Sequence, residues 1–298
     1  MNVYTSCDFA PISKVIPHMK IGFIGQGWIG RHYADDFESR GYETVRFGLE
    51  EEYAHNKHLL AACDIVFIAV PTPTTTAGFD DSIVREVIKL VGAGKIAVLK
   101  STVIPGTTKS LQEENREIFV LHSPEFLSEA TAAHDAAHPH RNIVGIPEDT
   151  SAYREKAQVV LDVLPPAPYA RIMDAKDAEF VKYAGNCFLF TKIIFINMLY
   201  DLVASTDSNW QDIRDALIHD PRIGASHTEP VHTSGRGAGG HCFIKDFEAF
   251  RKLYESNVQD IIGTKVLDAQ KDMNLKLLVE SGKDLDIVRS VYGIEALH

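Results

Sequence analysis

The glycine-rich segment 235–246 contains the residue best suited to covalent chemistry, Cys242. A helix is expected to begin at or just after this cysteine. A thiol at a helix N-terminus has a lowered pKa and is partly ionised, which makes it a nucleophile. Asp246 follows one turn later on the same helix face. A single cysteine is often a small buried apolar side chain, but glycines do not build a core and instead let the backbone approach a ligand. The segment therefore predicts a nucleophilic cysteine.

Lys182 and Asn186 are four residues apart, a spacing that places both side chains on one face of a helix. The residues around them are apolar, namely Phe180, Val181, Ala184, Phe188 and Leu189. Catalytic lysines exploit apolar settings, and an ammonium near Cys242 would favour its thiolate. A lysine that extends its ammonium to water fits the same pattern, so these residues alone leave both roles open.

Two further segments follow predicted strands, at the strand ends where an open α/β sheet binds its ligands. One is Ser101-Thr102-Val103, and the other is residues 123–129, which contain Glu125 and Glu129. Carboxylates at such a place can act as general acids or bases. Glu125 taken alone fits a solvated loop acid equally well.

Residues 25–30 follow a short apolar strand, begin a helix and have the pattern GxGxxG. The first glycine permits a tight turn, the second lets the backbone approach a pyrophosphate, and the third lets helix and strand pack closely. The helix N-terminus offers free N–H groups to the phosphates. The pattern predicts a dinucleotide bound by Gly25, Gln26, Gly27, Trp28, Ile29 and Gly30.

The choice between NAD and NADP depends on the end of the second predicted strand. The acidic residue expected there is missing, since the usual position falls near Gly48. A missing acid with an arginine nearby, here Arg46, can favour the 2′-phosphate of NADP. Alternatively, Glu50 or a backbone group serves the ribose hydroxyls. We expect NAD, with NADP as the alternative.

Alternating strands and helices position these residues. The predicted strands are residues 20–25, 43–47, 65–70, 96–99, 118–121 and 143–146, with helices ending near residue 40 and covering 81–91. Such alternation predicts an α/β fold with a Rossmann-like, doubly wound parallel sheet. The pattern fades near residue 175, and the remainder reads as an all-helical domain. We expect an N-terminal extension (1–19), a dinucleotide-binding domain (20–175) and a helical catalytic domain (176–298).

Composition argues against several classes of protein. The chain has 298 residues and a net charge of −11, so phosphate neutralisation would not drive it to bind nucleic acid. Its four cysteines are far apart and form no CxxC pair, which indicates a reducing, cytoplasmic setting. We expect no signal peptide and no membrane partner, since no stretch approaches the ~18 apolar residues of a membrane span. We also expect no metal, because no acidic or cysteine ligand completes a set with His134, His138 and His140.

Together, the motifs resemble the UDP-glucose/GDP-mannose dehydrogenase family. The resemblance runs from Lys20 to about Tyr254 and includes several motifs in the family's order. They are the glycine fingerprint, Val70-Pro71-Thr72-Pro73, Ser101-Thr102, Pro124-Glu125-Phe126-Leu127 with Glu129, His138-Pro139 with Arg141, Lys182 with Asn186, Asp220-Pro221-Arg222, and Gly239-Gly240 with Cys242, Lys245 and Asp246.

The resemblance implies two hydride transfers to NAD that turn a primary alcohol of a sugar or nucleotide sugar into a carboxylate. In the implied mechanism, Cys242 is the nucleophile that forms a thiohemiacetal and then a thioester. Lys182 and Asn186 donate hydrogen bonds to the negative charge that develops on oxygen. Glu125 is the base for hydrolysis, and Thr102 and Asp246 hold the water and orient the lysine. The other implied contacts are Pro71, Thr72, Ser101, Thr102, Glu129 and Lys245 for the cofactor, and Phe126, Leu127, Lys182, Asn186, Arg222 and Gly239 for the substrate. The long helix starting near residue 178 resembles the family's dimerisation helix, which implies a homodimer with Arg222 reaching the substrate across it.

The sequence departs from the family in two respects. About 50 residues follow Asp246 and read as helices, so we expect the family's second α/β domain, which binds the nucleotide of the substrate, to be absent. Ala238, His241 and Ile244 also stand where phenylalanine, serine and proline are usual, which leaves the sugar unidentified. Two alternatives stay open: a two-electron β-hydroxyacid dehydrogenase, and a non-catalytic cofactor-binding homologue.

Overall fold

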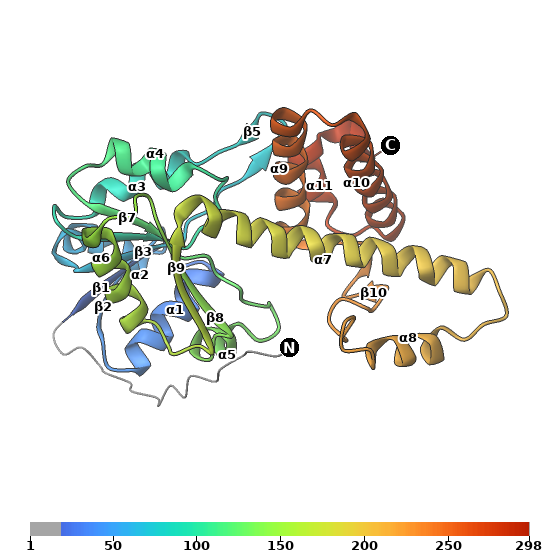
Figure 1. The fold of residues 1–298 in the computed structure, drawn as a ribbon, viewed down its shortest axis with the longest axis horizontal. Helices are drawn as coiled ribbons and strands as arrows, with labels where there is room; N and C mark the ends of the chain where they lie inside the picture. The colour runs from blue at the N-terminus through green and yellow to red at the C-terminus, as the bar shows by residue number, and fades with distance from the viewer. Residues whose placement is uncertain (1–18, 298) are drawn as a thin grey trace, which may run out of the picture. The chain divides into compact units, whose positions relative to one another are not determined.

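The computed structural model describes residues 19–297, so Cys7 and nearly all of the expected N-terminal extension lie outside the described residues. The chain divides into two compact units, which Figure 1 shows as a ribbon. Among the described residues, the first unit contains residues 19–72 and 81–180, and the second contains residues 73–80 and 181–297.

The first unit is built on a seven-stranded sheet with the order β2-β1-β3-β6-β7-β8-β9 (Figure 1). Its strands are β1 (Lys20–Ile24), β2 (Glu43–Phe47), β3 (Ile65–Ile68), β6 (Ile96–Leu99), β7 (Phe119–His122), β8 (Arg141–Ile146) and β9 (Tyr169–Asp174). The first five pair in parallel, as in a Rossmann sheet. The predicted α/β class and Rossmann-like sheet are confirmed.

The sheet is mixed rather than wholly parallel, which differs from the prediction. β8 pairs antiparallel with β7 and parallel with β9. The helix between β7 and β8, α5 (Ala132–Ala137), has six residues and is about 9 Å long, too short to run back along the sheet. The chain therefore re-enters the sheet in the opposite direction. β9 was not predicted, because this strand is largely exposed and lacks an apolar pattern.

Helices cover both faces of the sheet. One layer contains α1 (Trp28–Ser39) and α6 (Ser151–Val163), and the other contains η1 (His55–Ala62), α3 (Ser82–Val87), η2 (Ile88–Leu90) and α4 (Thr107–Glu114). Neighbouring strand residues alternate between the layers: Phe23, Phe67 and Val98 contact the first, whereas Ile24, Val66 and Leu99 contact the second. A short helix, α2 (Glu51–Ala54), follows β2.

The second unit is mainly helical, as expected. Its helices are α7 (Ala175–Ala204), whose first residues belong to the first unit, α8 (Trp210–Ile218), α9 (Gly240–Val258), α10 (Ile261–Ser281), α11 (Leu285–Tyr292) and η3 (Ile294–Leu297). Two small hairpins join β4 (Thr74–Thr75) to β5 (Gly78–Phe79) and β10 (Val231–His232) to β11 (Gly235–Arg236). β4 packs against α9 and α11, which is why residues 73–80 belong to this unit.

Within residues 19–297, α7 is the one helix long and apolar enough, by length and composition alone, to cross a membrane. No membrane span was expected, because the chain contains no uninterrupted run of ~18 apolar residues. The window in question has a mean hydropathy of 1.7 and is 33% buried. A core helix of a soluble protein passes the same test, so this one helix is weak support for a membrane location.

Candidate functional site

The turn between β1 and α1 requires glycine at two positions. Gly25 has a φ of +91°, and a Cβ there would lie 2.3 Å from the carbonyl oxygen of Ala69. A Cβ on Gly30 would lie 1.9 Å from the carbonyl oxygen of Gly25, so glycine lets α1 pack directly against the turn. Gly27 has open space around it and precedes α1 without a side-chain cap. The first N–H groups of α1 thus suit an anionic ligand such as a pyrophosphate.

The remaining residues of the fingerprint lie in the same turn. Gln26 is buried, and its amide nitrogen makes long hydrogen bonds of 3.4 Å to the carbonyls of Phe23 and Gly25. Its Oε1 is buried and accepts no hydrogen bond from the described residues. Trp28 and Ile29 are half-buried in the first turn of α1. A buried acceptor without a donor, next to an open helix N-terminus, fits a polar ligand that supplies the donor.

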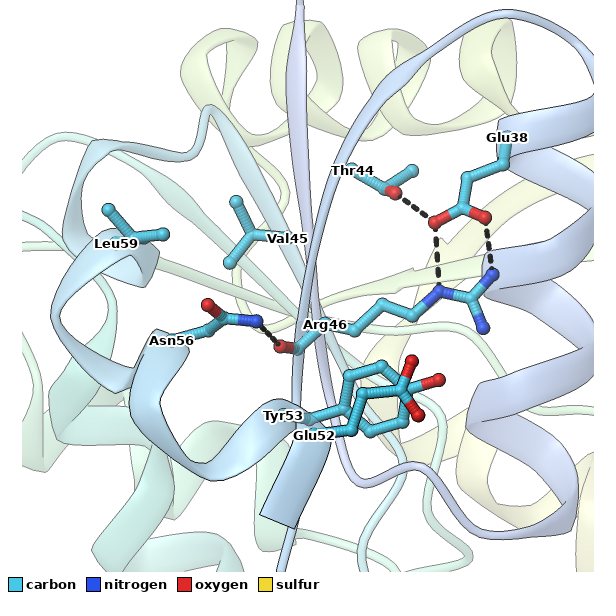
Figure 2. Close-up of a pocket in the computed structure, with 8 residues that line it drawn as sticks. All are labelled: Glu38, Thr44, Val45, Arg46, Glu52, Tyr53, Asn56 and Leu59. Carbon is cyan, nitrogen blue, oxygen red and sulfur yellow. Dashed lines mark hydrogen bonds and ion pairs between the residues drawn. The ribbon is translucent and has the colours of Figure 1, made fainter. Parts of the chain in front are cut away.

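Arg46, near the end of β2, is held by acidic residues of α1. Its guanidinium donates to Glu38 at 2.6 and 2.8 Å and to Asp35 at 2.7 Å. The hydrogen bond from Arg46 lowers the pKa of Glu38. Figure 2 shows this pair at a cavity of about 420 Å³. The cavity is lined by Glu38, Thr44, Val45, Arg46, Glu52, Tyr53, Asn56 and Leu59.

The loops that follow β3 and β6 are tied together. The hydroxyl of Ser101 accepts from the N–H of Val70 at 2.9 Å and donates to its carbonyl at 2.7 Å. The hydroxyl of Thr72 donates to the carbonyl of Thr102 at 2.6 Å. Pro71 lies exposed in the same loop. The structure therefore brings these four predicted cofactor residues together, although the Ser101 and Thr72 hydroxyls already bind protein.

The loop after β7 buries its first carboxylate. Glu125 is 2% exposed, and its carboxylate accepts from the N–H of Leu127 at 2.8 Å, so it is not a solvated loop acid. The ring of Phe126 lies under the guanidinium of Arg141, with 3.7 Å between the guanidinium carbon and the ring centroid. Leu127 packs on the core beside α1, and Glu129 is exposed.

Lys100 is a buried residue of this region that sequence reasoning missed. Its ammonium donates to the hydroxyl of Ser123 at 3.0 Å and lies 4.3 Å from the centroid of the Tyr33 ring. Burial lowers the pKa of Lys100 to about 7, and attraction to Glu125 opposes that effect. Its position in the sequence did indicate burial, because Lys100 directly follows the apolar residues 96–99 and both faces of a parallel strand are usually covered.

In the second unit, α7 and α9 bring together three predicted site residues, because Asn186 and Lys245 both bind the buried carboxylate of Asp246. Asp246 is 1% exposed and accepts from the amide nitrogen of Asn186 at 2.6 Å and from the ammonium of Lys245 at 2.5 Å. Lys182 is also buried, which disfavours the alternative that it extends into water. The proximity of Lys182 to Cys242 stays a prediction.

Cys242 lies exposed in the first turn of α9. That helix begins at Gly240, two residues earlier than expected, because Gly240 has a φ of +77° and can start the turn after the extended Gly239. Cys63 and Cys187 are buried, and burial raises the pKa of both thiols. The three cysteines in the described part of the chain form no disulfide.

The backbone before Cys242 is held by side chains that sequence reasoning did not find. Asn274 of α10 accepts from the N–H of Ala238 at 2.7 Å and donates to its carbonyl at 3.1 Å. The ammonium of Lys283 donates to three carbonyls between His232 and Gly237 at 3.2 to 3.4 Å. No local pattern marks either residue, since the partners are 36 or more positions apart in the chain.

Gly235 and Gly239 make room for protein atoms, whereas Gly240 has open space around it. The approach of this segment to a ligand stays a prediction. A Cβ on Gly235 would lie 2.4 Å from the Cβ of Ser281. A Cβ on Gly239, a predicted substrate contact, would lie 2.1 Å from Oδ2 of Asp284. The same carboxylate accepts from the N–H of Gly240 at 2.8 Å. The glycines thus fix the position of the start of α9.

Arg222 lies in the turn after α8 and is largely exposed. Its guanidinium binds the carboxylate of Asp220 at 2.6 to 3.2 Å, and its backbone N–H donates to the same group at 2.9 Å. The guanidinium of Arg222 is thus bound within its own turn. Among residues 19–297, no group of three or more His, Cys, Asp or Glu residues is placed to hold a metal ion.

The fold and the glycine turn define a Rossmann-type dinucleotide-binding protein. Residues 42–161 match the NAD binding domain of the UDP-glucose/GDP-mannose dehydrogenase family, and residues 176–276 match its central domain. The UDP-glucose 6-dehydrogenase of Rhizobium meliloti is 32% identical over 321 residues, covering 90% of this chain and 72% of the relative. The chain belongs to this family, and its first unit carries the family's NAD-binding domain.

A second relative and a solved structure are also similar to this chain. The UDP-glucose 6-dehydrogenase of Pseudomonas aeruginosa is 35% identical over 237 residues, which are 74% of this chain and 51% of the relative. This chain thus spans about half the length of several relatives that it matches. A UDP-glucose dehydrogenase structure from Pyrobaculum islandicum matches with a TM-score of 0.75 and 26% identity, covering 91% of this chain and 72% of that one.

Proposed function

We propose that this chain is an NAD-dependent dehydrogenase that oxidises a primary alcohol of a nucleotide sugar to a carboxylate, with Cys242 as the nucleophile. The observation that carries the proposal is the position of Cys242, exposed in the first turn of a helix that also presents Asp246. Thiols at helix N-termini are activated by the helix dipole. Membership of the family supports the reaction class.

The proposed reaction removes four electrons from one carbon atom. The alcohol first loses a proton and a hydride and becomes an aldehyde. The Cys242 thiolate then adds to the aldehyde carbon, and the resulting thiohemiacetal loses a second hydride and becomes a thioester. Water attacks this carbon, the carbon–sulfur bond breaks, and the products are a carboxylate and the free thiol. NAD, when bound, accepts one hydride in each oxidation, so each substrate consumes two NAD molecules.

Asn186 and Lys182 supply the donors for negative charge on the reacting oxygen in this proposal. One N–H of the Asn186 amide is bound by Asp246 at 2.6 Å, which fixes the side chain and leaves its second N–H for the oxygen. Lys182 adds an ammonium from one turn earlier on α7. A preorganised donor of this kind is worth roughly 3 kcal/mol of transition-state stabilisation.

In this proposal the first unit contributes the base and most of the cofactor contacts, and the second unit contributes Lys245, Gly239 and Arg222. Glu125 removes a proton from the water that hydrolyses the thioester, and Thr102 holds this water. Pro71, Thr72, Ser101 and Glu129, together with the glycine turn and Lys245, contact the cofactor. Phe126, Leu127, Gly239 and Arg222 contact the substrate. Each of these roles is a proposal drawn from the family resemblance.

We also propose that the protein is a cytoplasmic homodimer. α7 leaves Phe188, Phe195, Met198 and Leu202 more than half exposed. Large exposed apolar side chains on one helix mark an interaction surface. Arg222, exposed and on a separate turn, would then reach the substrate of the partner subunit.

Product stoichiometry tests the proposal. The purified chain is incubated with NAD and UDP-glucose, GDP-mannose or a simple sugar alcohol, and both NADH and the carboxylate are quantified. We expect two NADH per carboxylate with a nucleotide sugar, and no carboxylate from Cys242→Ala. Cys63→Ala, which removes a buried thiol of the first unit, is the matched control and should retain the ratio of two.

A two-electron dehydrogenase is the alternative reaction, and the same fold occurs in one such enzyme. The 3-hydroxyisobutyrate dehydrogenase of Mycobacterium tuberculosis matches with a TM-score of 0.65 and 16% identity, and this chain covers 98% of that one. The likeness shows the fold alone. One NADH per substrate, with Cys242→Ala fully active, would establish a two-electron dehydrogenase and reject the thioester route.

A further inference from the structure

The end of β2 lacks the acid that usually binds the adenosine ribose of NAD, since Gly48 stands in that place. We propose that Glu50 supplies the missing carboxylate from two residues further along the chain and thereby selects NAD over NADP. This inference rests on NAD binding by the first unit and is independent of the reaction proposed for Cys242.

The position of the Glu50 carboxylate explains why residue 48 is glycine. A Cβ on Gly48 would lie 2.2 Å from Oε2 of Glu50, so the carboxylate fills the space in which a side chain of residue 48 would begin. The same Cβ would lie 3.2 Å from Cβ and Cγ of Gln26. The carboxylate thus lies beside the glycine fingerprint, where an acid at residue 48 would have been.

The backbone holds this arrangement in place. The N–H of Gly25 donates to the carbonyl of Phe47 at 2.8 Å, which ties the end of β2 to the glycine turn. The carbonyl of Glu50 accepts from the N–H groups of Tyr53 and Ala54 at 2.9 Å, which fixes Glu50 at the start of α2. Glu50 is nevertheless exposed, so a ligand can reach its carboxylate.

The chemistry of the two cofactors differs at this point. The adenosine ribose of NAD presents two neighbouring hydroxyls, and a carboxylate can accept from both. NADP carries a phosphate in place of the 2′-hydroxyl, which a carboxylate repels. The side chain of Gln26 passes the same position with its Cβ and Cγ, and its buried Oε1 accepts no hydrogen bond from the described residues.

Arg46 is the group that could have accepted the phosphate, and the structure directs it elsewhere. It binds Asp35 and Glu38 of α1 (Figure 2 shows the Glu38 pair). These acids follow the first residue of α1 by 7 and 10 positions, and so lie about 10 and 15 Å along the helix from its N-terminus. The guanidinium is thus bound to the side of α1, where two carboxylates already balance the charge that a 2′-phosphate would need.

Cofactor affinity, measured by calorimetry without substrate, tests the proposal. The ligands are NAD, NADP and the NAD analogue with a 2′-deoxy adenosine ribose. We expect the unmodified chain to bind NAD at least about tenfold more tightly than the 2′-deoxy analogue, since a hydrogen bond to a charged group is lost. Glu50→Ala should bind both with similar affinity and should bind NADP more tightly than the unmodified chain does.

Two further variants serve as a control and as a rescue. Glu51→Ala removes the neighbouring exposed acid and should leave all three affinities unchanged. The double variant Gly48→Asp/Glu50→Ala returns an acid to residue 48 and should restore the preference for NAD. An unchanged ratio of NAD to 2′-deoxy affinity in Glu50→Ala, or an equal loss in Glu51→Ala, would overturn the proposal. Failure of the Cys242 chemistry would leave these affinities as they are.

Discussion

Lys100 offers a test of the first unit that needs neither cofactor nor substrate. The replacement Lys100→Met keeps the length of the side chain and removes its charge. Lys100 is buried, and its pKa falls from the ordinary 10.5 to about 7. A shift of that size corresponds to about 5 kcal/mol of disfavour for the charged form in the folded protein.

The sign of the pH dependence follows from proton binding. Between pH 7 and 10.5, the unfolded chain keeps a proton on this lysine that the folded protein has begun to release. The unfolded state therefore binds more protons, and the stability of the unmodified protein rises with pH in this range. Below pH 7 both states are protonated, and the full penalty remains.

Relative to the unmodified protein, Lys100→Met should thus lose about 2 kcal/mol of unfolding free energy between pH 7 and 9. Equilibrium urea denaturation of both proteins across this range measures the difference. Lys109→Met replaces an exposed lysine nearby and should show no such trend. A stability difference between Lys100→Met and the unmodified protein that stays constant with pH would contradict the lowered pKa of Lys100.

Three further substitutions test separate parts of the structure. Gly30→Ala places a Cβ 1.9 Å from the carbonyl oxygen of Gly25; it should weaken NAD binding at least tenfold and lower the unfolding free energy by about 1–3 kcal/mol, so unchanged calorimetric affinity would contradict the close packing. Asp246→Ala removes the hydrogen-bond partner of Asn186; it should cost about 3 kcal/mol and reduce turnover, and normal stability in urea would argue against a buried network. Asn274→Ala leaves a buried N–H and carbonyl without their partner; it should cost about 2–4 kcal/mol of unfolding free energy, and normal stability in urea would contradict the burial of these two hydrogen bonds.

Local patterns in the sequence were sufficient where one physical cause dominates. β3 and β6 are buried on every residue, so their apolar runs predicted them. The fingerprint at Gly25 and Gly30 was readable because backbone contacts exclude any side chain at both positions. The spacing of Lys182 and Asn186 predicted a shared helix face, and α7 carries both.

Features that depend on distant partners were not predictable. The hairpin of β4 and β5 packs on α9 and α11, which lie far along the chain. Lys283 and Asn274 resemble ordinary helix residues until their contacts with the segment before Cys242 are known. From the sequence, Gly48 indicated only that the usual acid is missing. The position of the Glu50 carboxylate beside Gly48 is visible only in the structure.

The proposed reaction requires that Cys242 becomes acylated, and mass spectrometry of the intact peptides can detect the acyl group. Glu125→Gln should slow thioester hydrolysis, so rapid acid quenching during turnover of NAD and a nucleotide sugar should trap the acyl enzyme. We expect a sugar-acid adduct on the peptide that contains Cys242 and on no peptide that contains Cys63 or Cys187. Formation of two NADH per substrate with Cys242 unmodified throughout, or with the adduct on another residue, would contradict it.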